Sequence, residues 1–130
     1  NKILGFIFKN NAGSFATPGD SIYVGLATAV SDAEAGSLTE ATFGSYARQQ
    51  VTAANWTLAS ASTNQQTVVN AANIEFPAST GTSNTVTHAF LVDAASSGNI
   101  LFVGALDASK TIATGDIFRI NAGNLTIELK

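Results

Sequence analysis

His88 is the only histidine in the chain, and Asp93 follows it five positions later in an apolar stretch. A histidine oriented by a carboxylate is a common general base for nucleophilic hydrolysis. However, side chains five positions apart on a strand point to opposite faces, and the sequence contains no G-x-S-x-G turn to expose a serine nucleophile. The spacing therefore favours a histidine that is hydrogen-bonded at a strand edge over a catalytic one.

Nine acidic residues are dispersed along the chain. Two carboxylates facing each other across a cleft are sufficient to hydrolyse a glycosidic bond, but Asp107 and Asp116 stand next to turn residues, where structural roles are more common. Asp32, Glu34 and Glu40 form the densest acidic group, yet they lack the glycine placement and terminal acid of a calcium loop. We therefore expect no catalytic, cofactor-binding or metal-binding residue, with opportunistic cation binding at this group as the alternative.

Arg48 stands out because charged residues make up only 12% of the chain. An arginine in such a protein is expected to pair with a specific acid, either within the chain or on a neighbouring subunit. Tyr23, Tyr46 and Trp56 are expected to anchor a core or an interface, and a sugar-stacking platform is the alternative. The residues expected at an interface are Ile3, Phe6, Phe8, Tyr23, Tyr46, Arg48 and Trp56.

The elements that position these residues read as short strands. The segment SIYVGLAT alternates, with Ile22, Val24 and Leu26 on one face and Tyr23 on the other. The last third predicts four more strands, with a hairpin connection at residues 95–99. Further strands are predicted at residues 46–51, 55–59 and 68–76, and an exposed loop with a helical turn near residues 38–41 is predicted at residues 29–45.

This spacing of strands and turns predicts an all-β fold, an antiparallel β-sandwich or jelly-roll-like barrel of about 7–9 short strands. At 130 residues the chain is expected to form one domain over residues 21–130, with residues 1–20 as an N-terminal arm or first element. The apolar run at residues 3–8 is too short to span a bilayer. It is expected to cover the core as a strand or helical turn, or to dock on a neighbouring subunit.

Composition excludes several partners. Six Lys and Arg residues and a net charge of -3 are poorly suited to neutralising a run of phosphates, so neither nucleic acid nor an anionic membrane surface is an expected partner. The chain has no cysteine, which rules out disulfides and thiolate metal sites. Stability must come from packing, strand pairing or assembly.

Several segments stand in a recognisable order, namely IYVGLAT, YARQQV, IEFP and then VTHAFLVDAASSGNILFVGALDASKTIATGDIFRINAGNLTIEL. In this order they resemble a family of small bacteriophage virion proteins, often labelled tail fibre or structural protein. The resemblance covers about residues 21–129 and is densest after Val86. It implies a non-enzymatic building block of the particle, on either the head or the tail.

A weakly charged surface suits subunits packed side by side, because dense repeated charge would cause repulsion. We therefore expect a capsid decoration or cement protein, a homo-oligomer that binds the major capsid protein on the virion after assembly in the host cytoplasm. The alternative is a tail-fibre or minor tail component that contacts tail proteins and binds a host surface glycan. A glycan-cleaving enzyme that uses Asp93, Asp107 and Asp116 is a third possibility.

Overall fold

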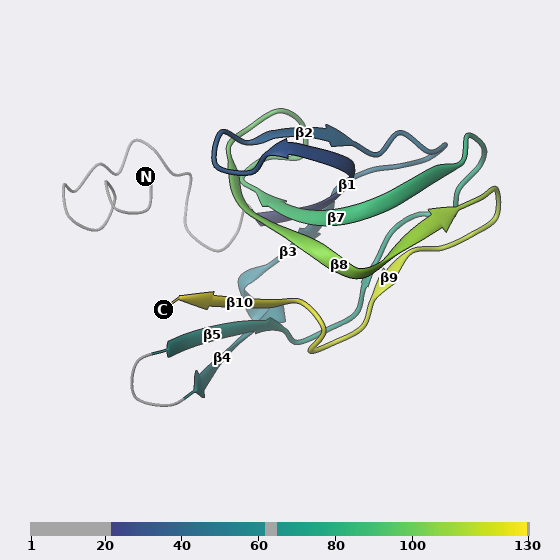
Figure 1. Cartoon of the computed structure of the whole chain (residues 1–130). Helices are drawn as coiled ribbons and strands as arrows, with labels where there is room; N and C mark the ends of the chain where they lie inside the picture. The colour runs from purple at the N-terminus through teal and green to yellow at the C-terminus, as the bar shows by residue number, and fades with distance from the viewer. Residues whose placement is uncertain (1–21, 62–64, 130) are drawn as a thin grey trace.

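The computed structural model describes residues 22–61 and 65–129, and every strand pair in it is antiparallel (Figure 1). The predicted all-β class is confirmed. A short 3-10 turn at Ala53–Asn55 is the one helical element in the described part, where no helix is long and apolar enough to cross a membrane. The strands are β1 (Ile22–Asp32), β2 (Ser37–Glu40), β3 (Gln49–Val51), β4 (Trp56–Ala61), β5 (Gln65–Asn70), β6 (Ile74–Glu75), β7 (Asn84–Val92), β8 (Ile100–Ile112), β9 (Arg119–Ile120) and β10 (Thr126–Leu129).

The largest sheet has five strands in the order β2-β1-β7-β8, with β3 also paired to β1. β7 occupies one edge of β1, so β2 and β3 share the other edge in succession. Residues Ile22 to Val24 pair with β3, and Ala27 to Asp32 pair with β2. Leu26 lies between these two ladders, at a point where neither β2 nor β3 supplies a paired residue.

The alternation predicted for β1 is present and produces two apolar clusters. Val24 and Leu26 point into the main core, whereas Tyr23 and Ala27 belong to a smaller cluster on the opposite face of the sheet. This arrangement follows from the two-residue period of a strand. β1 is therefore covered on both faces near its middle, and Val24, Leu26 and Ala27 are fully buried.

Three phenylalanines just outside strands build the centre of the main core. The ring of Phe76 meets that of Phe118 edge-on, with centroids 5.8 Å apart. Tyr46 stacks on Phe76 at 6.1 Å and meets Phe43 edge-on at 5.2 Å. Edge-on and offset contacts are the preferred geometries of aromatic pairs. This row of rings joins the β2–β3 connection to the segments that flank β6 and β9.

Two smaller sheets lie on one side of the large one (Figure 1). β10, β5 and β4 form a three-stranded sheet, and β6 pairs with β9. The connection between β9 and β10 is attached to the end of β5 through Asn70. The Oδ1 atom of Asn70 accepts a hydrogen bond from the Leu125 amide, and its Nδ2 atom donates to the carbonyls of Ala72 and Asn121.

Replacing Asn70 with alanine is expected to lower the free energy of unfolding by about 2–3 kcal/mol. The Asn70 side chain is 1% exposed, so its removal leaves one amide and two carbonyls without their partner in a region that water reaches poorly. Urea denaturation monitored by circular dichroism measures the change. Asn73→Ala is the control, because exposed Asn73 accepts a single amide hydrogen bond, from Ala122. Equal losses in the two variants would contradict the role assigned to Asn70.

The prediction of an exposed loop at residues 29–45 is wrong over much of that range. β1 continues to Asp32 and returns as β2 at Ser37, where a helical turn was expected. The turn between them is stabilised by Asp32, whose Oδ1 atom accepts the amides of Glu34 and Ala35, and by Gly36 with a φ of 71°. Glycine adopts this left-handed conformation with little strain. The small and acidic residues therefore make a tight hairpin instead of a long loop.

The single strand predicted at residues 68–76 is also wrong, because β5 ends at Asn70 and β6 begins at Ile74. The Asn70 side chain donates to the carbonyl of Ala72, and such local bonds compete with strand pairing. The four strands predicted in the last third are present as β7, β8, β9 and β10. The hairpin connection predicted near residues 95–99 joins β7 to β8.

Candidate functional site

Arg48 is held by an acid and by two loop carbonyls of the same chain. Its Nε atom donates to Glu40 Oε1 and its Nη2 atom to Glu40 Oε2, each at 2.8 Å. Its Nη1 atom donates to the carbonyls of Ala94 at 2.9 Å and Ser97 at 2.7 Å. The guanidinium also lies 5.4 Å from the centroid of the Phe90 ring. The ion pair expected for Arg48 is thus formed within the chain, in the two-pronged geometry typical of arginine and carboxylate.

Tyr46 extends this arrangement to the main sheet. Its hydroxyl donates to Glu40 Oε1 at 2.7 Å and accepts the Leu26 amide at 3.0 Å. Leu26 is the β1 residue between the β3 and β2 ladders, so the phenol oxygen provides the acceptor that its amide requires. Glu40, Tyr46 and Arg48, termed the Glu40–Tyr46–Arg48 network below, therefore connect β1, the β2–β3 connection and the β7–β8 turn.

The β7–β8 turn is shaped to present its carbonyls to Arg48. Asp93 closes the turn by accepting hydrogen bonds from the amide and side chain of Asn99, at 2.6 Å and 2.8 Å. Ser97 and Gly98 have φ angles of 55° and 83°. A Cβ atom on Gly98 would lie 2.6 Å from Asp93 Oδ1, so glycine is needed there for space as well as for backbone conformation.

The network keeps its charges fixed near neutral pH. Burial tends to raise the pKa of Glu40, but hydrogen bonds from Arg48 and Tyr46 and the charge of Arg48 lower it below 4.5 overall. The hydrogen bonds to Glu40 raise the pKa of Arg48, although burial opposes this. Burial is the main cause of the raised pKa of Tyr46. These pKa shifts mean that Glu40 and Arg48 stay charged and hydrogen-bonded at neutral pH. None of the three side chains is therefore set to exchange protons there.

Acid is expected to weaken the protein through Glu40. Because the folded-state pKa of Glu40 lies below 4.5, the network contributes stability above about pH 4.5 and loses it as the pH falls through the folded-state pKa. Free energies of unfolding measured between pH 7 and pH 3 should therefore fall more steeply for the native chain than for Glu40→Gln. Glu34→Gln, which removes an exposed carboxylate from the β1–β2 turn, controls for lost charge. Parallel profiles for the native chain and Glu40→Gln would refute this role.

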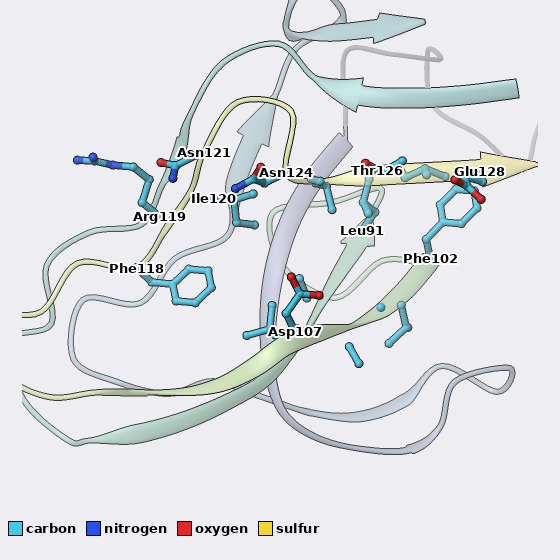
Figure 2. Close-up of a pocket in the computed structure, with 17 residues that line it drawn as sticks. Leu91, Phe102, Asp107, Phe118, Arg119, Ile120, Asn121, Asn124, Thr126 and Glu128 are labelled. Atoms are coloured by element: carbon cyan, nitrogen blue, oxygen red, sulfur yellow. The ribbon is translucent and has the colours of Figure 1, made fainter. Parts of the chain in front are cut away.

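A groove of about 500 Å³ lies between β8, β9 and β10 (Figure 2). Phe118 and Asp107 point into it from two sides, whereas Arg119 points outward and pairs with Glu75. The groove mixes apolar side chains with a few polar ones. Its lining residues are Ala89, Leu91, Phe102, Val103, Gly104, Ala105, Leu106, Asp107, Phe118, Arg119, Ile120, Asn121, Asn124, Leu125, Thr126, Ile127 and Glu128.

Two strand edges border part of this groove, and Ala89 and Leu91 of the inner strand β7 line another part of it. Consecutive residues 102–107 of β8 and 126–128 of β10 line it, as expected where a strand borders a space with its edge, because successive side chains point to opposite faces. In residues 22–61 and 65–129, β8 pairs only with β7 and β10 only with β5. Each strand therefore has one edge without a strand partner in this part of the chain, and the groove lies alongside.

The β8 edge is interrupted by a bulge. Ala105 is paired with His88 and Lys110 with Val86, so residues 106–109 have no paired residue on β7. Bulges of this kind twist an edge strand and limit uncontrolled pairing with other chains. A second register shift separates Ile100, which pairs with Val92, from Phe102, which pairs with Leu91, so the regularly paired part of β8 that borders the groove is residues 102–105.

The four predicted interface residues that the structure describes, Tyr23, Tyr46, Arg48 and Trp56, are not gathered into one surface. Tyr46 and Trp56 pack against the main core, and Tyr23 packs against the smaller cluster on the other face of the sheet. Arg48 is held in its network. Their roles at an interface stay predictions, and Ile3, Phe6 and Phe8 lie outside the described residues.

His88 and Asp93 are not partners. The Nδ1 atom of His88 lies 2.7 Å from the Thr87 hydroxyl, and Asp93 binds Asn99. The prediction that His88 lies at a strand edge is wrong, because β7 pairs with β1 on one side and β8 on the other. Among the described residues no three His, Asp or Glu side chains are grouped closely enough to hold a metal ion. In the expected acidic group, Glu40 binds Arg48 and Asp32 closes its own turn.

Sequence reasoning did not find the groove. Its walls come from segments that are far apart in the sequence, and it has no local motif. Phe118 and Ile120 are apolar, which indicates burial, but their sequence gives no information about which distant residues pack around them. The partner of Arg48 carried a weak signal, since Glu40 is a nearby acid in a chain with little charge.

The antiparallel sheets define an all-β protein with a fixed polar network and an open groove. Comparison with known families agrees: residues 1–128 match the family described as podophage GP4 fiber I protein gp80. The chain belongs to this family of phage fibre proteins, as the resemblance to small virion proteins led us to expect, and it is a component of the virion. No curated protein matches it.

Proposed function

We propose that this chain is a structural subunit of a virion fibre, assembled in the host cytoplasm, whose contacts are with copies of itself and with tail proteins. The observation that carries the proposal is the family match over residues 1–128. The groove with two strand edges supports it, because such edges are common sites of chain association. No step of this function requires a catalytic group.

The Glu40–Tyr46–Arg48 network supports a role in which the subunit resists mechanical force. It attaches the β2–β3 connection and the β7–β8 turn to β1 through side-chain hydrogen bonds of 2.7–3.0 Å. Loops attached in this way resist local opening, which begins where contacts are few. A fibre subunit transmits force between its neighbours, and rigid loops would reduce the deformation of each subunit.

A capsid decoration protein that binds the major capsid protein is a second candidate. The weakly charged composition favours it, since subunits on a shell are densely packed and dense repeated charge would cause repulsion.

A host surface glycan is a candidate partner for the fibre role, because Asn121, Asn124 and Asp107 place amides and a carboxylate beside the apolar side chains of the groove. Polar groups of this kind orient small ligands in apolar sites.

Electron microscopy of intact particles tests the fibre role against the capsid role. Antibody fragments against this chain, detected by their added density, are expected to bind at the tail. Fragments against the major capsid protein should cover the shell in the same preparation and so control for access. Labelling of the shell at hundreds of positions would support decoration of the capsid and overturn the fibre proposal.

A further inference from the structure

We infer that the groove between β8, β9 and β10 binds residues 3–8 of a second copy of this chain as an added strand. The inference rests on the fibre proposal to the extent that a fibre brings copies side by side. It identifies the partner as another copy, the acceptor as the two open strand edges, and the donor as an apolar N-terminal arm.

The acceptor side requires a strand-like occupant. Amides and carbonyls along a strand edge need hydrogen-bond partners, and an extended peptide supplies them in register. An occupant between β8 and β10 can pair with either edge, both of which lack a strand partner in residues 22–61 and 65–129. Residues 102–105 of β8 offer about 13 Å of regular strand between two register shifts.

The side chains of the groove call for an apolar occupant. Leu91, Phe102, Leu106, Phe118 and Ile127 all line it. A peptide that covers them removes apolar surface from water, which is the main favourable term in association. Peptides that bind as an added strand gain affinity from the backbone and selectivity from alternate side chains in pockets.

The donor side meets these requirements. Residues 3–8 read ILGFIF and are six residues long, about 20 Å as a strand, which is the length of the stretch 102–107 of β8 that lines the groove. In strand geometry, Leu4, Phe6 and Phe8 share one face, and this face can enter the groove. Lys2 and Lys9 bracket the run, and Asp107 supplies a negative charge in the groove.

The chain between donor and β1 is long enough for exchange between copies. Residues 9–21 number thirteen and reach about 43 Å when extended. This exceeds the length of the groove wall, so an arm can reach a neighbouring copy. We assign the arm to a second copy because a fibre requires a contact between copies, and the groove is the surface where the described residues leave two strand edges open together.

The first experiment measures the mass of the full chain in solution by analytical ultracentrifugation. We expect the native chain to associate at micromolar concentration and Phe6→Asp/Phe8→Asp to weaken association at least tenfold, with an unchanged circular dichroism spectrum. Ala12→Asp/Ala16→Asp adds the same charge to the connecting segment and should associate as the native chain does. Association that survives Phe6→Asp/Phe8→Asp would overturn the inference.

The second experiment uses the absence of cysteine from the chain and does not depend on the aspartate variants folding. A Phe8→Cys chain is mixed with a mass-tagged Asp107→Cys chain under mild oxidation. A Leu4→Cys chain is tested in the same way, because an added strand can run in either direction and so bring either end of residues 3–8 close to Asp107. A disulfide-linked pair of one tagged and one untagged chain is expected for one donor position. Ser45→Cys, on an exposed loop residue outside the groove, replaces Asp107→Cys as the control.

The outcomes separate the inference from the fibre proposal. If the double variant Phe8→Cys/Asp107→Cys and its Leu4 counterpart crosslink only within one chain, the arm occupies its own groove and exchange between copies is refuted. If neither position crosslinks to Asp107→Cys more than to Ser45→Cys, the arm does not bind the groove. Both results leave the location of the protein on the particle untouched, which electron microscopy decides independently.

Discussion

Phe90→Ala is expected to lower the free energy of unfolding by about 3–5 kcal/mol, the usual cost of truncating a buried aromatic residue. Phe90 is 0% exposed and packs with Ala27 and Val92 in the smaller cluster. Its ring also lies under the Arg48 guanidinium, 5.4 Å from the centroid. Truncation therefore leaves a cavity and removes the apolar surface on which Arg48 rests. Urea denaturation provides the measurement.

Gly25 explains why the Phe90 ring fits where it does. A Cβ atom on Gly25 would overlap Phe90 Cζ and lie 2.7 Å from Cε1. Gly25→Ala is therefore expected to cost about 1–3 kcal/mol through overpacking. Gly104→Ala is the control, because a Cβ atom there meets nothing within 4 Å, and its effect should stay within about 0.5 kcal/mol.

The double variant Gly25→Ala/Phe90→Ala tests this contact directly. Once the ring is absent, the added methyl group has space, so the combined loss should be smaller than the sum of the two single losses. A double-mutant cycle that gives a strictly additive result would show that Phe90 and Gly25 do not constrain each other. In that case the stability loss of Phe90→Ala would be explained by the cavity alone.

The strands that could be predicted from sequence are those with a strong local pattern. β1 alternates over Ile22 to Leu26, and the last third carries apolar pairs separated by turn residues. The hairpin from β1 to β2 was missed because its small and acidic residues have weak strand propensity. Pairing with β1 and the Asp32 turn impose the strand there, and tertiary context of this kind is invisible in the local sequence.

The core was harder to predict than the strands. Phe43, Phe76 and Phe118 lie just outside strands, where a two-residue period gives no information about which face is buried. Glu40 is six positions from the nearest acid, Glu34, and its role depends on Tyr46 and Arg48 across the β2–β3 connection. The groove depends on edges whose position is decided only after all three sheets have formed.

Arg48→Met is expected to lower the free energy of unfolding by about 2–4 kcal/mol. The Arg48 side chain is 10% exposed and that of Glu40 is 30% exposed, so the variant leaves a partly buried carboxylate without its cation. The carbonyls of Ala94 and Ser97 lose their donor as well. Arg48→Lys should recover only part of the loss, because an ammonium cannot reproduce the two-pronged bond to Glu40 and both carbonyl contacts.

Arg119→Met is the matched control for this effect. Arg119 also pairs with a glutamate, Glu75 at 2.6 Å, but the two side chains are 49% and 47% exposed. Exposed pairs contribute little because water and salt screen them, so this variant should change stability by about 0.5 kcal/mol or less. Similar small losses for Arg48→Met and Arg119→Met would show that the Glu40–Tyr46–Arg48 network is a surface ion pair and does not hold the β7–β8 turn.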